Sequence, residues 1–252
     1  MTTIEYKGIT QPQQCFNAFT NTSITFLDVP SNFQDEYFCG LNFLFDSGVC
    51  GSSSSECYYH QYLNGSMFIR GSGDITVIPQ YSSFIRTLNI SLNSISWDSH
   101  FFSGKSFLKI LEIKTNRISF GAFAFNNCLS LEFVYIKSSS ITMKAFSFSD
   151  CIGLKYLKLS TTSASFDAFA FHTSSLLQYI IFEGSKQPSF DAFAFEEAYP
   201  AIIVDKSYSS STFFGFKVSV LNDDGDKAIT TGSCGNGCNF EFEAFNGVLE
   251  LL

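Results

Sequence analysis

The chain has 252 residues, of which 45% are hydrophobic, enough for a continuous core. Its net charge is −8, and its 15 lysines and arginines are scattered rather than gathered into a stripe that would bind nucleic acid. No apolar run approaches the roughly 20 residues that span a bilayer, and the start lacks the pattern of a secretory signal. We therefore expect a folded protein without nucleic-acid binding or membrane insertion, and only mild repulsion from anionic membranes.

The N-terminal residues 1–73 show little repetition. An isolated Phe16-Asn-Ala18-Phe19 suggests one diverged repeat, whereas residues 31–73 have no clear register and include three cysteines. Solenoid proteins need atypical units at their ends to cover the core. We therefore predict that residues 1–73 are a cap or degenerate repeats.

A phenylalanine-containing pattern recurs through the middle of the chain. The phenylalanine excess, 31 residues in all, falls largely at its repeat positions in the middle third, so we expect these side chains to fill the core. A fixed period of about 20 to 50 residues predicts a solenoid, in which each unit gains a core only by stacking on its neighbours. The most constant feature is an Ala-Phe pair, at steps of 23, 23 and 24 residues: Ala122-Phe123, Ala145-Phe146, Ala168-Phe169 and Ala192-Phe193.

Each unit ends in a Leu-X-X-Leu-X-Leu segment, for example Leu131, Val134 and Ile136. This segment is typical of leucine-rich repeats, because its fourth and sixth residues alternate inward on a short strand. The preceding Phe-X-Ala-Phe half is expected to form the opposite wall as one helical turn, with Phe120 and Phe123 on one face and Ala122 where rungs approach closely. The predicted fold class is therefore an α/β repeat solenoid over residues 74–205, with one short parallel strand per repeat of about 23 residues.

Two cysteines share one repeat position. Cys128 and Cys151 lie 23 residues apart, so they fall on adjacent rungs. They are interpreted as small buried apolar residues, with an inter-rung disulfide as the alternative.

Residues 206–252 are predicted to be degenerate repeats. Phe213-Phe-Gly215-Phe216 and Phe242-Glu-Ala244-Phe245 retain parts of the pattern, and a loop insertion over 222–238 separates them. Cys234 and Cys238 in this loop could supply two thiolates to zinc or form a disulfide, but zinc needs four ligands and no further pair lies nearby. No metal site is predicted.

An Ala-Phe pair, a cysteine some five residues later and then Leu-X-X-Ile/Leu-X-Ile together resemble the BspA-like leucine-rich repeat family, also called the Treponema pallidum type. The match is best from about residue 95 to residue 205. The resemblance implies a curved right-handed solenoid, and members are generally regarded as surface or secreted proteins engaged in adhesion. The absence of a recognisable signal or anchor favours the alternative, a cytoplasmic structural or scaffold protein within a larger assembly.

Motifs for catalysis are weak. Gly104-Lys-Ser106 lacks the earlier glycine of a phosphate-binding loop, and the acidic run 222–226 lacks both end carboxylates of a calcium loop. His60, His100 and His172 are the only histidines, and no carboxylate pair shares a register. We expect no enzyme activity and no cofactor.

The remaining candidate site is the outward face of the predicted sheet. Strand residues three and five of each segment should form two columns, with neighbouring rungs about 4.8 Å apart. An exposed aromatic strip of this kind marks protein contacts, unless another segment, such as the N-terminal stretch, covers it or it merely stabilises the sheet. The proposed partner-binding residues, for a protein partner of unknown identity, are Ile110, Glu112, Phe133, Tyr135, Tyr156, Lys158, Tyr179 and Ile181.

Overall fold

The computed structural model describes residues 2–8, 10–15, 18–19, 24–28, 37–39, 41–42, 44–51, 56–62, 65–72, 75, 85–191, 193–220, 228–235 and 238–244. These residues form β-strands joined by turns, and they include no helix that is long and apolar enough to cross a membrane. Residues 16–17 of the Phe-X-Ala-Phe pattern, the acidic run 222–226 and the side chains of Cys234 and Cys238 lie outside the described part.

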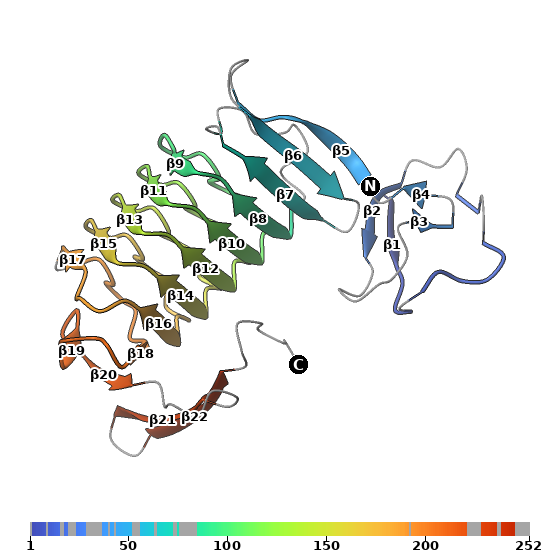
Figure 1. Ribbon diagram of the computed structural model, residues 1–252. Helices are drawn as coiled ribbons and strands as arrows, with labels where there is room; N and C mark the ends of the chain where they lie inside the picture. Colours follow the sequence, from blue (N-terminus) through green and yellow to red (C-terminus); the bar gives the residue numbers. More distant parts are fainter. Residues whose placement is uncertain are drawn as a thin grey trace.

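One long sheet runs the length of the molecule, in the order β19-β20-β18-β16-β14-β12-β10-β8-β7-β6-β5 (Figure 1). From β7 to β18 its strands are parallel, and equivalent residues of successive repeats pair directly, as Ile110 does with Phe133. Its strands are β5 (Leu44–Val49), β6 (Cys57–Tyr62), β7 (Ser66–Gly71), β8 (Thr87–Ser91), β10 (Ile110–Lys114), β12 (Phe133–Lys137), β14 (Tyr156–Ser160), β16 (Tyr179–Glu183), β18 (Ala201–Val204), β19 (Thr212–Phe213) and β20 (Phe216–Val220).

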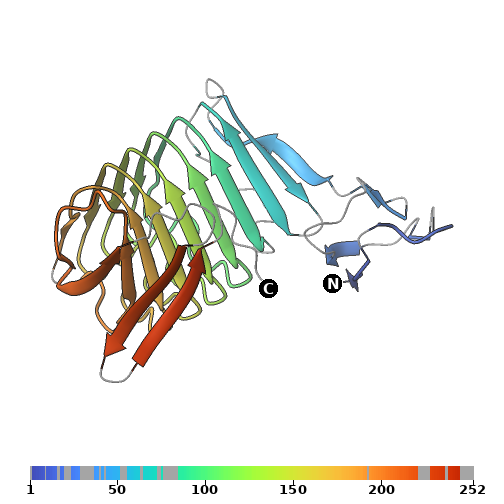
Figure 2. The ribbon, with the colours of Figure 1, turned by 60° about the horizontal axis from the view of Figure 1, so that its bottom comes forward.

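A second parallel sheet forms another side of each coil. It contains β9 (Ser94–Ser96), β11 (Arg117–Phe120), β13 (Ser140–Met143), β15 (Ser163–Phe166) and β17 (Ser189–Phe190). Three small sheets lie at the ends of the stack (Figures 1 and 2). They are the parallel pair β1 (Thr2–Glu5) and β2 (Ile24–Asp28), and the antiparallel pairs β3 (Tyr37–Phe38) with β4 (Leu41–Asn42) and β21 (Ala228–Gly235) with β22 (Cys238–Ala244).

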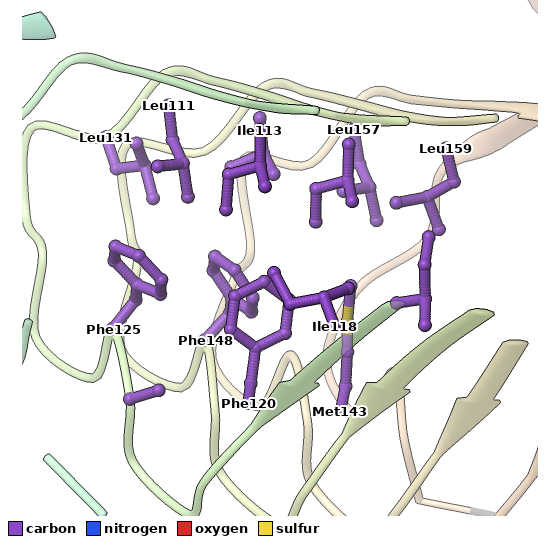
Figure 3. Packing of buried hydrophobic residues seen from close by; sticks show 14 of the residues in the cluster. Leu111, Ile113, Ile118, Phe120, Phe125, Leu131, Met143, Phe148, Leu157 and Leu159 are labelled. Atoms are coloured by element: carbon purple, nitrogen blue, oxygen red, sulfur yellow. The ribbon is translucent and has the colours of Figure 1, made fainter. Parts of the chain in front are cut away.

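The core lies between the two long sheets and the turns that join them. Strands of the main sheet alternate buried and half-buried residues, so that Leu111 and Ile113 of β10 point inward. Phe120 of β11 and Phe125 of the following turn face them from the other sides, as Figure 3 shows. The predicted solenoid, with a parallel strand recurring about every 23 residues in the main sheet, is therefore confirmed, and each repeat adds a second short strand that the sequence did not predict.

The expected helical turn is wrong, and with it the α part of the α/β class. In residues 121–127 the backbone N–H groups alternate between two kinds of acceptor: Ala124 donates within its own rung to Gly121 O at 3.3 Å, whereas Phe125 donates to Ser147 O of the next rung at 2.7 Å. A helix would use these donors internally and leave the rungs unlinked. Phe123 takes a left-handed φ of 59° and is only half-buried, so it does not share a buried face with Phe120.

The cysteines divide by region. Cys128 and Cys151 are free and buried, which confirms their interpretation as buried residues, and their thiols point to the carbonyl oxygens of Phe102 and Phe125 at 3.4 and 3.2 Å. Burial raises the pKa of the Cys151 thiol well above its usual value. The N-terminal cysteines form two disulfides, Cys15–Cys39 and Cys50–Cys57.

Candidate functional site

The first predicted column forms a continuous aromatic stack on the outward face of the main sheet. The rings of Phe133 and Tyr156 lie 5.0 Å apart with planes 5° from parallel, and Tyr156 and Tyr179 lie 5.4 Å apart at 10°. Ile110 precedes them in register on β10, and all four side chains are half-buried. We call these four residues, with Glu112, Tyr135 and Lys158 of the second column, the aromatic strip.

The stacking decides which part of each ring a partner can touch. The middle ring, Tyr156, has both faces against its neighbours, so a partner would meet this ring at its edge. Burial is the main cause that raises the pKa of the Tyr179 phenol, and the neighbouring Tyr156 raises it further. This phenol therefore stays protonated at neutral pH. The column thus presents apolar ring edges and, at Tyr179, a neutral hydroxyl group.

The second column contains charges that are paired on the protein itself. Lys158 Nζ lies 2.7 Å from Glu183 Oε1 and 5.6 Å from the centre of the Tyr135 ring. Glu112 pairs with Lys114 at 2.7 Å, and this hydrogen bond raises the pKa of Lys114. Because these pairs are near the surface, each contributes little to stability, but together they leave the strip with little local net charge.

Ile181 does not join the open strip. Its side chain is 5% exposed, and Ile203, the next residue of the same column on β18, is 0% exposed. Strand β21 of the C-terminal hairpin lies against β18 and β20, beside this end of the sheet (Figure 2). The expectation that the whole second column faces solvent is corrected at this position, where a C-terminal strand lies beside the sheet.

Sequence reasoning missed a polar depression at the edge of the strip. It is open, has a volume of about 530 Å³ and is lined partly by Glu112 and Tyr135 of the strip. The turn residues Asn93 and Asn116 also line it, and Thr115 Oγ1 donates to Asn93 O at 3.1 Å. The two asparagines are 23 residues apart, so their shared repeat position was the available signal.

The residues considered for chemistry have structural partners. His100 stacks on Phe123 at 4.8 Å, and His172 Nδ1 lies 3.1 Å from Glu196 Oε2. Gly104 occupies a corner with φ of 72°, where a glycine is favoured, so its role is in the turn. No group of three or more metal-ligating side chains occurs within the described ranges.

Asp150 belongs to a polar row that joins neighbouring rungs. It accepts hydrogen bonds from Thr173 Oγ1 at 2.6 Å, Asn126 Nδ2 at 2.9 Å and Ser149 Oγ at 3.0 Å. These hydrogen bonds lower the pKa of Asp150, and the bond from Thr173 has the largest effect. The row is therefore a structural link and not an acid–base site.

Comparison with known proteins identifies the repeats. Residues 80–202 match the model of the BspA type leucine rich repeat region in six copies. No curated protein and no solved structure matches the chain. Solenoids of such repeats are typically non-catalytic scaffolds that mediate protein–protein interaction. Residues 80–202 are thus a BspA type leucine rich repeat region.

Proposed function

We propose that this protein is a non-catalytic recognition module that binds a protein partner through the aromatic strip, in surface adhesion or host and cell recognition. The observation that carries the proposal is the open stack of Phe133, Tyr156 and Tyr179 on a rigid sheet. Aromatic residues are enriched in protein interfaces, and an ordered stack loses little side-chain entropy on binding. In this proposal residues 1–73 and 206–252 flank the repeats of residues 74–205 as end units.

The ring geometry favours a protein over a sugar as the partner. A pyranose ring stacks on an exposed aromatic face, whereas the faces within this column contact each other. The phenol groups of Tyr156 and Tyr179 and the paired charges at Lys158 and Glu112 suit a mixed apolar and polar surface. A protein interface has this composition.

Site-specific photo-crosslinking tests the strip. A photoreactive residue at Thr87, which precedes Ile110 in the first column, is compared with one at Ser119, which faces outward on the second sheet. We expect a protein captured from Thr87 and not from Ser119. The affinity of the captured, purified protein should then fall about tenfold or more in Tyr156→Ala/Tyr179→Ala, as for interface anchors.

The matched control is Thr142→Ala/Ser165→Ala, two half-buried residues on the outward face of the second sheet. Its affinity should equal that of the wild type. Equal capture from both positions, or unchanged affinity in the tyrosine variant, would contradict the proposal. A large loss of stability in the tyrosine variant would assign the strip to sheet stabilisation instead.

The second candidate is the intracellular scaffold, and the disulfides separate it from adhesion. Cys15–Cys39 and Cys50–Cys57 favour an oxidising compartment, where disulfides persist. Because these bonds use four of the eight cysteines, the unfolded protein should titrate at most four thiols when isolated without reductant. Eight reactive thiols would favour the scaffold.

A further inference from the structure

A row of β-turns links the phenylalanine-rich segments to the main sheet. The turns span 105–108, 128–131, 151–154 and 174–177, and each closes with a hydrogen bond from its fourth N–H to its first carbonyl. The bond from Leu131 N to Cys128 O, for example, measures 3.0 Å. The two central residues of each turn form its tip.

Each tip carries one large apolar side chain exposed to solvent. The exposed fractions are 51% for Phe107, 42% for Leu129, 48% for Ile152 and 51% for Leu176. We call these four residues the turn-tip ridge.

Turn geometry does not explain these residues. Turn tips favour glycine, asparagine, aspartate and serine, and the other central residue of each turn is indeed Ser106, Ser130, Gly153 or Ser175. The apolar residue comes first in the tip at Leu129 and Ile152, but second at Phe107 and Leu176. The apolar character is thus retained although its position within the turn changes, which indicates a role at the surface.

The ridge is held straight by the backbone on both sides. Before the turn 128–131, Asn127 N donates to Ser149 O at 3.0 Å, and after it Glu132 N donates to Lys109 O at 2.8 Å. The turns also pack closely, because a Cβ atom at Gly153 would lie 2.6 Å from Leu129 O. The apolar tips therefore form a fixed line along the solenoid.

We propose that the turn-tip ridge binds the surface of a zwitterionic phospholipid bilayer, as a shallow contact that does not cross the bilayer. A flat apolar boundary can meet a straight line of projecting tips all at once, and apolar side chains of this kind insert at the boundary between headgroups and acyl chains. Phe107 stands at one end of the row, and aromatic rings favour that boundary.

Area and charge favour lipid over a second copy of the chain. About half of four large side chains is on the order of 400 Å², roughly half of what each partner buries in a stable protein interface. Beside the ridge, Glu132 and Lys155 form a pair at 3.1 Å, so this flank carries no stripe of one sign. With a net charge of −8, the protein has no attraction to anionic lipid, and a neutral bilayer suits it better.

Vesicle flotation of the full chain tests the proposal with phosphatidylcholine vesicles at low and high salt. The wild type should float at both salt concentrations, because the contact is apolar. The variant Leu129→Ser/Ile152→Ser/Leu176→Ser should reduce the bound-to-free ratio at least about tenfold. Its thermal midpoint should stay near that of the wild type, since all three side chains are about half exposed.

The matched control is Val49→Ser/Tyr58→Ser/Val220→Ser, which removes three equally exposed apolar residues elsewhere and should float like the wild type. A wild type that does not float, or a ridge variant that floats equally well, overturns the proposal. A wild-type dimer that the ridge variant converts to a monomer, without flotation, would assign the ridge to a second copy. Tyr156→Ala/Tyr179→Ala should float normally, so this result is independent of the proposed partner site.

Discussion

Two ladders of stacked rings run side by side through the same turns. Their ring spacing is similar, but they differ in burial and in backbone conformation. Neighbouring rings in both lie about 5 Å apart. The inner ladder consists of Phe102, Phe125, Phe148, Phe171 and Phe195, which are 0 to 7% exposed. The outer ladder consists of His100, Phe123, Phe146, Phe169 and Phe193, which are half-buried or exposed.

The backbone separates the ladders further. Phe123, Phe146 and Phe169 have φ values of 59° to 61°, a region that costs a residue with a Cβ about 1 to 2 kcal/mol. The inner phenylalanines have no such strain. Stacking alone therefore does not identify a core position, and energetic importance should follow burial and backbone conformation.

The largest expected effect is on the inner ladder. Phe148 is 0% exposed and stacks on Phe125 at 5.0 Å and Phe171 at 5.4 Å. Phe148→Ala should lower the free energy of unfolding by about 3 to 5 kcal/mol, because a cavity opens in the middle of the stack. Chemical denaturation of the variant measures this loss.

Phe148→Leu is the control, since it fills most of the volume and should cost clearly less than the alanine variant. Phe148→Gly should be worse than Phe148→Ala by about 0.5 to 1 kcal/mol, as at an ordinary backbone position. A loss below about 1 kcal/mol in Phe148→Ala would show that the inner ladder is not the core.

The outer ladder should respond less and in a different order. Phe146→Ala removes two stacking contacts, at 4.9 and 5.1 Å, from a half-buried position and should cost about 1 kcal/mol. Phe146→Gly should be more stable than Phe146→Ala, because glycine accepts a φ of 59° without strain. Chemical denaturation measures the free energy of unfolding of both variants. If Phe146→Gly is less stable than Phe146→Ala, the left-handed backbone conformation at this position is wrong.

The sequence predicted the repeat but not which phenylalanine of each repeat is buried. The 23-residue period predicted the parallel sheet and its register, because strand residues alternate with a fixed period of two. The Ala-Phe pair was interpreted as the core side of a helical turn, whereas Phe125 and Ala124 are buried and Ala122 and Phe123 are not. Hydrogen bonds between rungs decide this, and they involve residues 22 positions apart, such as Phe125 and Ser147, which local pattern reasoning does not weigh.

The position of the aromatic strip could be predicted from the repeat register, except where the repeats end. The register alone places Phe133, Tyr156 and Tyr179 in one outward column, and the structure has them stacked. The burial of Ile181 depends on the end of the solenoid, where the repeat pattern stops. The turn-tip ridge was not predicted, because its apolar residue shifts by one position within the turn between repeats. It is the first central residue at Leu129 and Ile152 but the second at Leu176.

The smallest expected effect concerns Ser147, which lies between the two ladders. It is 0% exposed, and its hydroxyl has no hydrogen-bond partner within the part of the chain that the structure describes. Ala124 and Ala170, at the same position of the neighbouring rungs, are also 0% exposed. Ser147→Ala should therefore raise the free energy of unfolding by about 1 kcal/mol, because a buried unpaired hydroxyl group is removed without leaving a cavity.

Ser174→Ala provides the opposite case in the same denaturation experiment. Ser174 is equally buried, but its Oγ donates to Phe148 O at 3.3 Å, so its loss should cost about 1 kcal/mol. Opposite signs for the two serines would show that the column between the ladders is dry and closely packed. If both variants lose stability, the Ser147 hydroxyl is satisfied in solution, and water reaches the space between the ladders.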